Sequence, residues 1–372
     1  MQARILEMWL ARAGSVPIFC HIKYKGALNF HVHHLVSKLV PHVSRWKNIH
    51  LQLPIECLTP LFAIHQVDAP LLKSLTVKHI HFGATSVLQH TPPIEFVRFP
   101  GGARLREMQI DIPHSCLPKL HLPWAQLEEL TLTESSVRGT RIKSRNSQLT
   151  LNDALDILRR LPNLRCCTLG IGHQLLSVPS VPIVVPIVVP RLQKLFLHAE
   201  PTQFGLFLES IILPQLEKLT IYGHCGPELQ PFLGRSNHPI KELDFIRVCD
   251  MSADELFNCL QLVPSLTHLQ CTFPVGELIL RALTPSTLVD NSLSCLCPHL
   301  NFVEFRCHHP FNALAEMIEG RWESRSAVGV SQLKRARLHL RCKPDLSLTA
   351  EADLIKRLQK CADAGLDLVW SL

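Results

Sequence analysis

The stretch LPQLEKLTI, residues 213–221, returns along the chain in nearly the same form. VPRLQKLFL stands at 189–197, VPSLTHLQC at 263–271 and CPHLNFVEF at 297–305. Each copy contains three apolar positions in the order L-x-x-L-x-L, often with Pro two residues ahead of the first. Self-similarity at a period of roughly 20 to 50 residues is the sequence signature of a repeat protein.

The spacing within one copy predicts a short strand. In L-x-L two aliphatic residues flank a polar one, which is the period of a half-buried strand. The first aliphatic residue fits the bend that leads into the strand, where Pro is tolerated because no ladder donor is needed. One such strand cannot bury its apolar face alone, so we expect consecutive copies to stack on one another.

Eleven segments share this three-position pattern, with successive anchors 22 to 37 residues apart. They are Trp46/Ile49/Leu51, Leu72/Leu75/Val77, Leu105/Met108/Ile110, Leu127/Leu130/Leu132, Leu164/Cys167/Leu169, Leu192/Leu195/Leu197, Leu216/Leu219/Ile221, Ile240/Leu243/Phe245, Leu266/Leu269/Cys271, Leu300/Val303/Phe305 and the weaker Leu333/Ala336/Leu338.

Helical patterns separate several of these strands. The segment 151–164 has Asn152 and Asp153 as start signals and Pro162 as its stop. Ser252 is a predicted N-cap for a second helix that Pro264 ends. Similar patterns occupy 311–323 and the C-terminal segment, where Gly365 is placed to end a helix before a closing strand at 366–370.

Strands and helices in alternation predict an α/β fold, a leucine-rich-repeat solenoid. We expect an irregular horseshoe with parallel strands on its concave face and helices on its convex face. Residues 1–44 would form an N-terminal capping and lead-in segment, and residues 45–372 the leucine-rich-repeat domain of about eleven irregular repeats.

Composition narrows the classes of function. Of the 372 residues, 47% are hydrophobic and 19% charged, which argues against wholesale disorder. A net charge of +7 is too mild for a typical nucleic-acid binder. The apolar run 178–190 is short and interrupted by Pro, so we expect an extended connector and no membrane span. The first residues do not form a signal peptide, so the 14 Cys are expected to be reduced thiols in the cytoplasm, the nucleus or both.

Two segments give the chain a resemblance to a known family. MWLARAGSVPIFCHIKY (8–24) and LVPHVSRWKNIHLQL (39–53), together with the repeats, resemble the leucine-rich-repeat region of F-box-like proteins of mushroom-forming fungi. The resemblance implies the substrate-recognition part of a ubiquitin-ligase adaptor. In that family an F-box, which docks on Skp1, precedes the first segment. Here Met1 stands close ahead of Trp9, so Skp1 binding is expected only if a longer product carries an F-box.

The chain also departs from the usual repeat in the turn after each strand. The Asn or Cys that normally satisfies backbone groups there is mostly replaced, for example by Ser135, Glu200, His224 and His308. We therefore expect uneven curvature.

In such a solenoid the residues between the buried aliphatics point out of the sheet. The resulting face would change from acidic to mixed to basic along the chain and could orient a protein target. Its candidate residues are Glu107, Gln109, Asp111, Glu129, Thr131, Thr133, Lys194, Phe196, Lys218, Thr220, Tyr222, Glu242, Asp244, Glu304, Arg306, Arg335, Arg337 and His339. Phe196 and Tyr222 are the strongest single candidates, because exposed aromatics often anchor interfaces. The plainer alternative is that all of these are solvated strand residues.

Other clusters point to no chemistry. Cys295, Cys297 and His299, with Cys307, His308 and His309, lack the usual spacing of zinc ligands. HVHH (31–34) has no matching thiols, and the basic loop 137–146 has the character of a solvated insertion. Phosphate-binding, zinc-protease and serine-hydrolase motifs are absent, so we expect no enzyme, cofactor or metal. The sequence favours a protein-binding module, and the alternative is a stand-alone structural or inhibitory repeat protein unconnected to ubiquitination. An enzyme with an unrecognised site and a decayed, non-functional copy stay open as further alternatives.

Overall fold

The structure is a computed structural model with two compact units, residues 1–192 and 193–372. Each unit is described by itself. The described residues are 2–24, 31–62, 69–79, 102–111, 123–132, 149–172, 186–235, 239–248, 251–287, 293–307, 311–324, 329–340 and 348–371. Thr133, Ser135, His308, His309, the basic loop 137–146 and most of the apolar run lie outside them.

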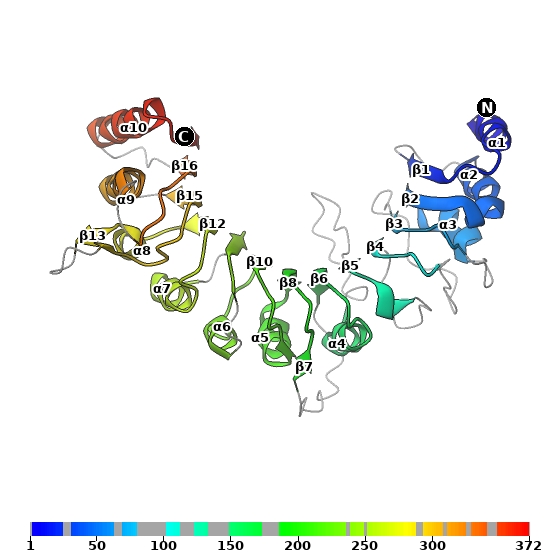
Figure 1. Cartoon of the computed structure of the whole chain (residues 1–372), viewed down its shortest axis with the longest axis horizontal. Helices are drawn as coiled ribbons and strands as arrows, with labels where there is room; N and C mark the ends of the chain where they lie inside the picture. The colour runs from blue at the N-terminus through cyan, green and yellow to red at the C-terminus, as the bar shows by residue number, and fades with distance from the viewer. Residues whose placement is uncertain are drawn as a thin grey trace. The chain divides into compact units, whose positions relative to one another are not determined.

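Unit 2 alternates strands with helices, as the repeats predict (Figure 1). Its parallel strands follow one another in chain order: β8 (Lys194–Ala199), β10 (Lys218–Tyr222), β11 (Glu242–Ile246), β12 (His268–Pro274), β15 (Phe302–Cys307), β16 (Arg335–Leu340) and β17 (Asp367–Ser371). Its helices are α5 (Pro201–Glu209), α6 (Leu229–Arg235), α7 (Ala253–Gln261), α8 (Glu277–Leu283), α9 (Phe311–Glu323) and α10 (Leu348–Asp363). The short strands are β9 (Ile211–Ile212) and the antiparallel pair β13 (Ser286–Thr287) and β14 (Leu293–Ser294).

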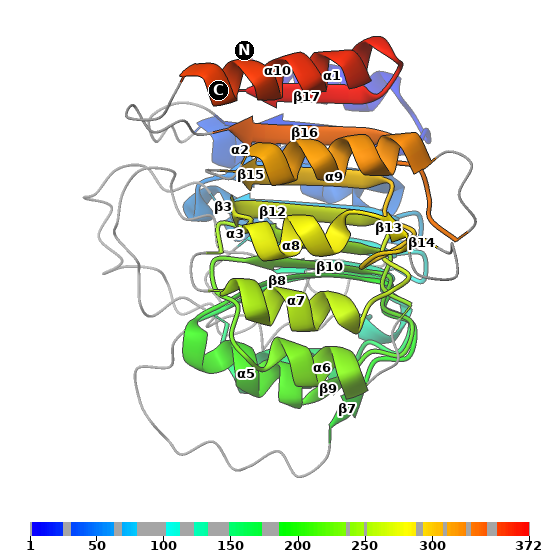
Figure 2. The same ribbon diagram turned by 90° about the vertical axis from the view of Figure 1, so that its left-hand side faces the viewer.

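The helices of unit 2 lie on one side of the strands, and successive helices stack in chain order (Figure 2). Among the described residues of unit 2, no helix lies on the other side of the sheet, which we call the open face. Strand, helix and parallel strand in repeated succession define the leucine-rich-repeat solenoid, so the predicted fold class is confirmed.

The repeat consensus is realised as aligned layers of buried side chains. Leu219 pairs in register with Leu195 on one side and Leu243 on the other, and all three are at most 2% exposed. Leu197, Ile221 and Phe245 form the next layer, equally buried. Full burial of a Leu or Phe side chain stabilises a fold by about 1.5–3 kcal/mol. The stacked layers therefore supply the apolar core that a single repeat lacks.

A second regular feature precedes most of the repeat strands. The backbone carbonyl of Glu217 accepts two N–H groups from the next repeat, those of Lys241 (2.8 Å) and Glu242 (3.0 Å). The carbonyls of Lys241 and Thr267 do the same for the repeats that follow. These paired bonds fix the register of neighbouring repeats with backbone atoms alone, so side chains at these positions are free to vary.

Unit 1 follows the same plan. Its parallel strands are β1 (Ile18–Lys23), β2 (Trp46–Leu53), β3 (Ser74–His79), β4 (Glu107–Asp111), β5 (Glu129–Leu132) and β6 (Cys166–Ile171), and a short strand β7 covers Ile187–Val188. Its helices are α1 (Gln2–Arg12), α2 (His31–Leu39), α3 (Ile55–Phe62) and α4 (Leu151–Arg159), with short 3-10 segments η1 (Val40–Arg45) and η4 (Trp124–Gln126). Strand β1 pairs with β2, so the expected lead-in segment 1–44 contributes a strand to the repeat sheet.

The helix ends show which start signals act. Ser252 caps α7 as predicted, in a reciprocal pair with Glu255. The predicted start of α4 is off by a few residues, because Thr150 is its N-cap and accepts from the Asp153 N–H at 3.2 Å. Asn152 lies inside that helix. At the C-terminus, α10 ends before Gly365, whose φ of +103° glycine adopts without strain, and β17 closes the sheet as expected.

One charged residue lies wholly inside unit 2. Arg321 of α9 is 0% exposed, and its guanidinium donates to the carbonyls of Leu283 and Leu296, both at 2.7 Å, and of Cys297 at 3.2 Å. These carbonyls end α8 and line the segment that leads into β15. Arg321 thus satisfies a stretch of irregular backbone that no helix or strand pairs.

Candidate functional site

The predicted face residues of unit 2 lie on its open face, where three rows run across the strands. In the first row Lys194, Lys218, Glu242, His268, Phe302, Arg335 and Asp367 are register neighbours. In the second, Phe196, Thr220, Asp244, Gln270, Glu304 and Arg337 are neighbours. The third includes His198 beside Tyr222, and Arg306 beside His339.

The first cluster on this face surrounds Asp244. Its carboxylate accepts from the Thr220 hydroxyl at 2.9 Å and lies 3.1 Å from Lys218 Nζ. His268 Nε2 approaches its other oxygen at 3.4 Å. Lys218 also donates to Glu242 at 2.6 Å, and this bond lowers the pKa of Glu242 below its usual range. Lys218 is thus shared by two carboxylates, and because burial lowers the pKa of His268, the cluster keeps a negative excess at neutral pH.

The exposure predicted for Asp244 is wrong. The residue is 4% exposed, as are other short side chains in the interior of the rows: Thr220 at 5% and Asp111 of unit 1 at 4%. A side chain with few atoms cannot rise above the longer lysine, glutamate and histidine side chains of the adjacent strands. Asp244 is consequently a buried support for Lys218 and His268, and a target would meet these two first.

A second cluster surrounds Glu304. Gln270 donates to its carboxylate at 2.8 Å, and Arg337 and His339 each approach it at 3.7 Å. Arg335 is paired with Asp367 on the next strand. The basic end of the predicted charge gradient is thus partly compensated by acidic neighbours.

Aromatic side chains gather in a third cluster, the aromatic patch, formed by Phe196, His198, Tyr222 and Arg247. The ring of Tyr222 lies 6.3 Å from Phe196 and 5.1 Å from His198, the latter edge-on. The Arg247 guanidinium donates to the Tyr222 hydroxyl at 2.9 Å and lies 5.7 Å from its ring centre. Phe196 and Tyr222 are half-buried, whereas His198 and Arg247 are exposed.

Arg247 is held in an uncommon backbone conformation. Its φ is +54°, in the left-handed region that a residue with a Cβ enters at a cost of roughly 1–2 kcal/mol. Its N–H donates to the hydroxyl of Thr272 on β12, which fixes this conformation. Arg247 thus combines a strained backbone with a side chain that braces the half-buried ring of Tyr222.

Unit 1 contributes the acidic candidates. Glu107 and Glu129 are exposed and directly paired in register on β4 and β5. Two carboxylates side by side on neighbouring strands repel each other, so this part of the face favours a basic partner. Further toward the N-terminus, Phe19, His21, Asn48, His50, Ser74 and Thr76 line a shallow hollow of about 320 Å³, together with backbone-level Cys20 and Ile49.

Of the Cys/His cluster, the structure describes Cys295, Cys297, His299 and Cys307. No group of three or more ligating side chains comes together among the described residues. Cys297 and Cys307 are buried, and burial raises the pKa of each thiol to about 12. His299 is exposed.

Two kinds of residue were missed from the sequence. His198, His268, Gln270 and Phe302 obey the same spacing rule as the chosen candidates and could have been included. His268 and Phe302 in fact stack face to face at 3.9 Å. Arg247 follows the end of β11, where the spacing rule no longer applies, and only its backbone conformation reveals it.

Comparisons with known proteins add little to this picture. No family model matches the chain. No curated protein matches it. Among solved structures it is similar to a protein from Bacteroides fragilis, with 14% identity and a TM-score of 0.32, over 67% of this chain and 57% of that one.

It is also similar to the leucine-rich-repeat ectodomain of the plant receptor kinase GASSHO1/SCHENGEN3 from Arabidopsis thaliana, solved in complex with CASPARIAN STRIP INTEGRITY FACTOR 2. There the identity is 11% and the TM-score 0.25, over 82% of this chain and 34% of that one. The fold assignment therefore rests on the strand order and register described above. Within the described ranges, no helix is both long and apolar enough to cross a membrane.

Proposed function

We propose that this chain is a protein-binding leucine-rich-repeat module whose target docks on the open face of unit 2, centred on the aromatic patch. The observation that carries the proposal is the braced Tyr222, held between Phe196, His198 and the strained Arg247. Tyr and Arg dominate the residues that contribute most to protein interfaces. A pre-positioned ring also loses little side-chain entropy when a target binds.

The chemistry of the patch defines its partner. An aliphatic or aromatic side chain of the target would pack on Phe196 and Tyr222. A carboxylate of the target would lie close to Arg247 or to Lys194, which is exposed at the edge of β8. The clusters of charged residues around Asp244 and Glu304 would surround this contact. They would fix its orientation, because charged groups at the rim of an interface contribute more to specificity than to affinity.

A narrower role rests on the sequence resemblance alone. We propose that the module recognises substrates for an F-box-type ubiquitin ligase, in the cytoplasm or nucleus, and has no catalytic activity of its own. The alternative is a stand-alone structural or inhibitory repeat protein. Capture of Skp1 and a cullin distinguishes these two roles.

The experiment is affinity capture from a lysate of the source organism, with mass spectrometry of the retained proteins. The wild-type chain is compared with Phe196→Ser/Tyr222→Ser. The control is Leu206→Ser/Leu262→Ser, which removes two apolar side chains that are also exposed, at 42% and 40%, but lie on α5 and just after α7.

We expect a protein that the wild type and the control retain and the patch variant loses. Skp1 among the retained proteins would support the ligase role, and its absence would favour the stand-alone role. A partner retained equally by all three chains would refute docking on the aromatic patch.

A further inference from the structure

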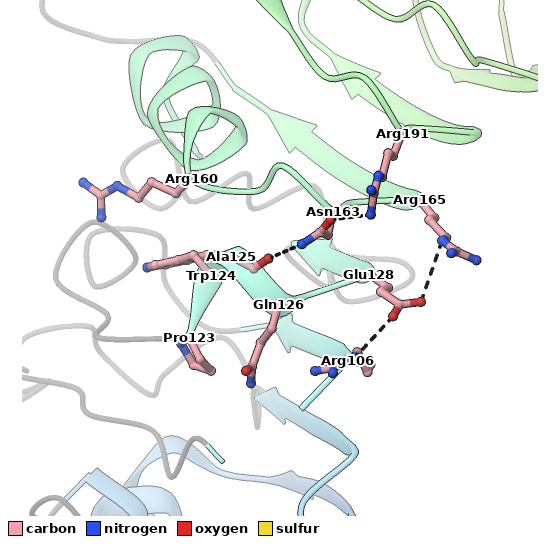
Figure 3. Close-up of a pocket in the computed structure, with 10 residues that line it drawn as sticks. All are labelled: Arg106, Pro123, Trp124, Ala125, Gln126, Glu128, Arg160, Asn163, Arg165 and Arg191. Atoms are coloured by element: carbon pink, nitrogen blue, oxygen red, sulfur yellow. Dashed lines mark hydrogen bonds and ion pairs between the residues drawn. The ribbon is translucent and has the colours of Figure 1, made fainter. Parts of the chain in front are cut away.

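A groove in unit 1 is lined by an unusual number of arginines (Figure 3). It lies at the edge where β4, β5 and β6 begin, and its volume is about 660 Å³. Its charged lining consists of Arg106, Arg160, Arg165, Arg191 and the single carboxylate of Glu128. Four positive charges against one negative charge leave an excess of three.

The repeat architecture brings these side chains together. Arg106, Glu128 and Arg165 each immediately precede a strand, and the carbonyls of Arg106 and Glu128 pair with the next repeat. Consecutive repeats therefore place these three side chains next to one another along one edge. Arg160 comes from the end of α4, and Arg191 from the turn after β7.

Contacts within the groove hold the guanidinium groups in place. Glu128 lies between Arg106 and Arg165, at 3.3 and 3.8 Å. Arg106 also donates to the Ala103 carbonyl at 3.0 Å. Arg191 donates to Asn163 Oδ1 at 2.6 Å, and the Asn163 amide donates to the Ala125 carbonyl at 2.7 Å. The positive charge of Arg191 thus faces a neutral amide, and no acid among the described lining residues lies against it.

We propose that this groove binds an anion with two or more phosphoryl groups. A guanidinium presents a planar fork of donors that matches phosphate oxygens, and it stays charged at any physiological pH. The single carboxylate compensates about one of the four guanidinium charges, so a multiply charged ligand is needed for the rest. The volume falls in the range of small-molecule sites, roughly 300–1,000 Å³, which is far more than one phosphate fills. This site is independent of the aromatic patch and of any protein target bound there.

The test measures binding of inorganic tripolyphosphate to the full chain by titration calorimetry, in buffers of matched ionic strength. We expect saturable binding. Arg165→Gln/Arg191→Gln should weaken it at least tenfold, since each charge-assisted hydrogen bond contributes about that factor. The control Arg12→Gln/Arg281→Gln removes the same charge from exposed arginines of α1 and α8 and should bind like the wild type.

A second variant guards against misfolding as an explanation. Glu128→Gln removes the one carboxylate among the described residues that line the groove, so we expect it to bind tripolyphosphate several-fold more tightly than the wild type. A damaged fold cannot produce such a gain. Equal binding of tripolyphosphate by all variants would overturn the proposal. Loss of tripolyphosphate binding in a chloride buffer of the same ionic strength would also overturn it. Citrate binding as tightly as tripolyphosphate would overturn the preference for phosphoryl groups.

The source of the phosphoryl groups is decided by a second titration. A peptide with two adjacent phosphoserines is compared with its unphosphorylated form and with free tripolyphosphate. Tighter binding of the phosphopeptide assigns the groove to a phosphorylated protein segment, and tighter binding of tripolyphosphate assigns it to a free polyphosphate. Failure of both overturns the proposal.

Discussion

We expect the substitution Arg247→Gly to weaken target binding by the aromatic patch while it leaves the free energy of unfolding of the protein nearly unchanged. Glycine adopts a φ of +54° freely, so the substitution relieves about 1–2 kcal/mol of backbone strain. Against this, glycine lowers the free energy of unfolding by roughly 0.5–1 kcal/mol, because its backbone is more flexible in the unfolded state. Loss of the exposed bond to Tyr222 costs about 0.5–1.5 kcal/mol more. These contributions cancel to within about 1 kcal/mol. Arg247→Ala keeps the strain and loses the bond, so it should be the less stable variant.

The assay has two parts. Urea unfolding followed by circular dichroism gives the stability of the wild type, Arg247→Gly and Arg247→Ala. Surface plasmon resonance with the captured target then gives their affinities. We expect Arg247→Gly to match the wild type in stability and to bind the target at least tenfold more weakly. A loss of that size is typical when a residue that anchors an interface is removed. If glycine proves less stable than alanine, the strain argument fails. If affinity is unchanged, Arg247 does not support binding.

Three further predictions concern other parts of the chain. Arg321→Met should lower the free energy of unfolding of unit 2 by about 3 kcal/mol, measured by urea denaturation, because it leaves several buried carbonyls without donors; a loss below 1 kcal/mol would contradict this. Burial lowers the pKa of His50 and of His268 in the folded protein. When the pH is lowered, the unfolded state therefore takes up protons at a higher pH than the folded state does. The free energy of unfolding should then be fully retained above the ordinary histidine pKa of about 6.5 and fall as the pH drops below it, and His268→Gln should flatten that fall. Helix α1 exposes Ile5, Met8 and Trp9, at 54%, 54% and 47%; replacing all three with Gln should raise the monomer fraction in light scattering, and an unchanged profile would show that this face does not self-associate.

The repeat strands were predictable because one physical requirement defines them. Every aliphatic position of the consensus in β8, β10, β11 and β12 is buried, and the register matches the sequence alignment. The helices were predictable only where periodicity and an N-cap coincide, as in α7 with Ser252. The sequence 201–209 forms α5 although it contains Gly205, which disfavours the interior of a helix, whereas Pro201 suits the first helical position. There, packing of Phe204 and Phe207 against the sheet outweighs local propensity.

The candidate site was predictable in its location and less so in its chemistry. Alternation places Asp244 on the open face, but burial depends on the size of the side chains on adjacent strands, some 24 residues away in sequence. Pairwise neutralisation of Lys218 with Glu242, or of Arg335 with Asp367, likewise follows from register between distant segments. The charge gradient predicted from the order of residues along the chain is therefore weaker on the folded surface, where neighbouring strands pair opposite charges.

This neutralisation has a consequence for recognition. Where opposite charges already pair, a target gains little by replacing one partner, because it must first separate the existing pair. Binding energy must then come from positions whose side chains are positioned but not satisfied by an opposite charge. On the open face of unit 2 the aromatic patch offers apolar surface in its place, since the rings of Phe196 and Tyr222 are only half-buried. In unit 1 the arginine groove meets the condition, since Arg191 contacts a neutral amide and no acid among the described lining residues pairs with it. The geometry of the Arg191 guanidinium is thus fixed by an uncharged acceptor, which leaves its charge available to an incoming anion.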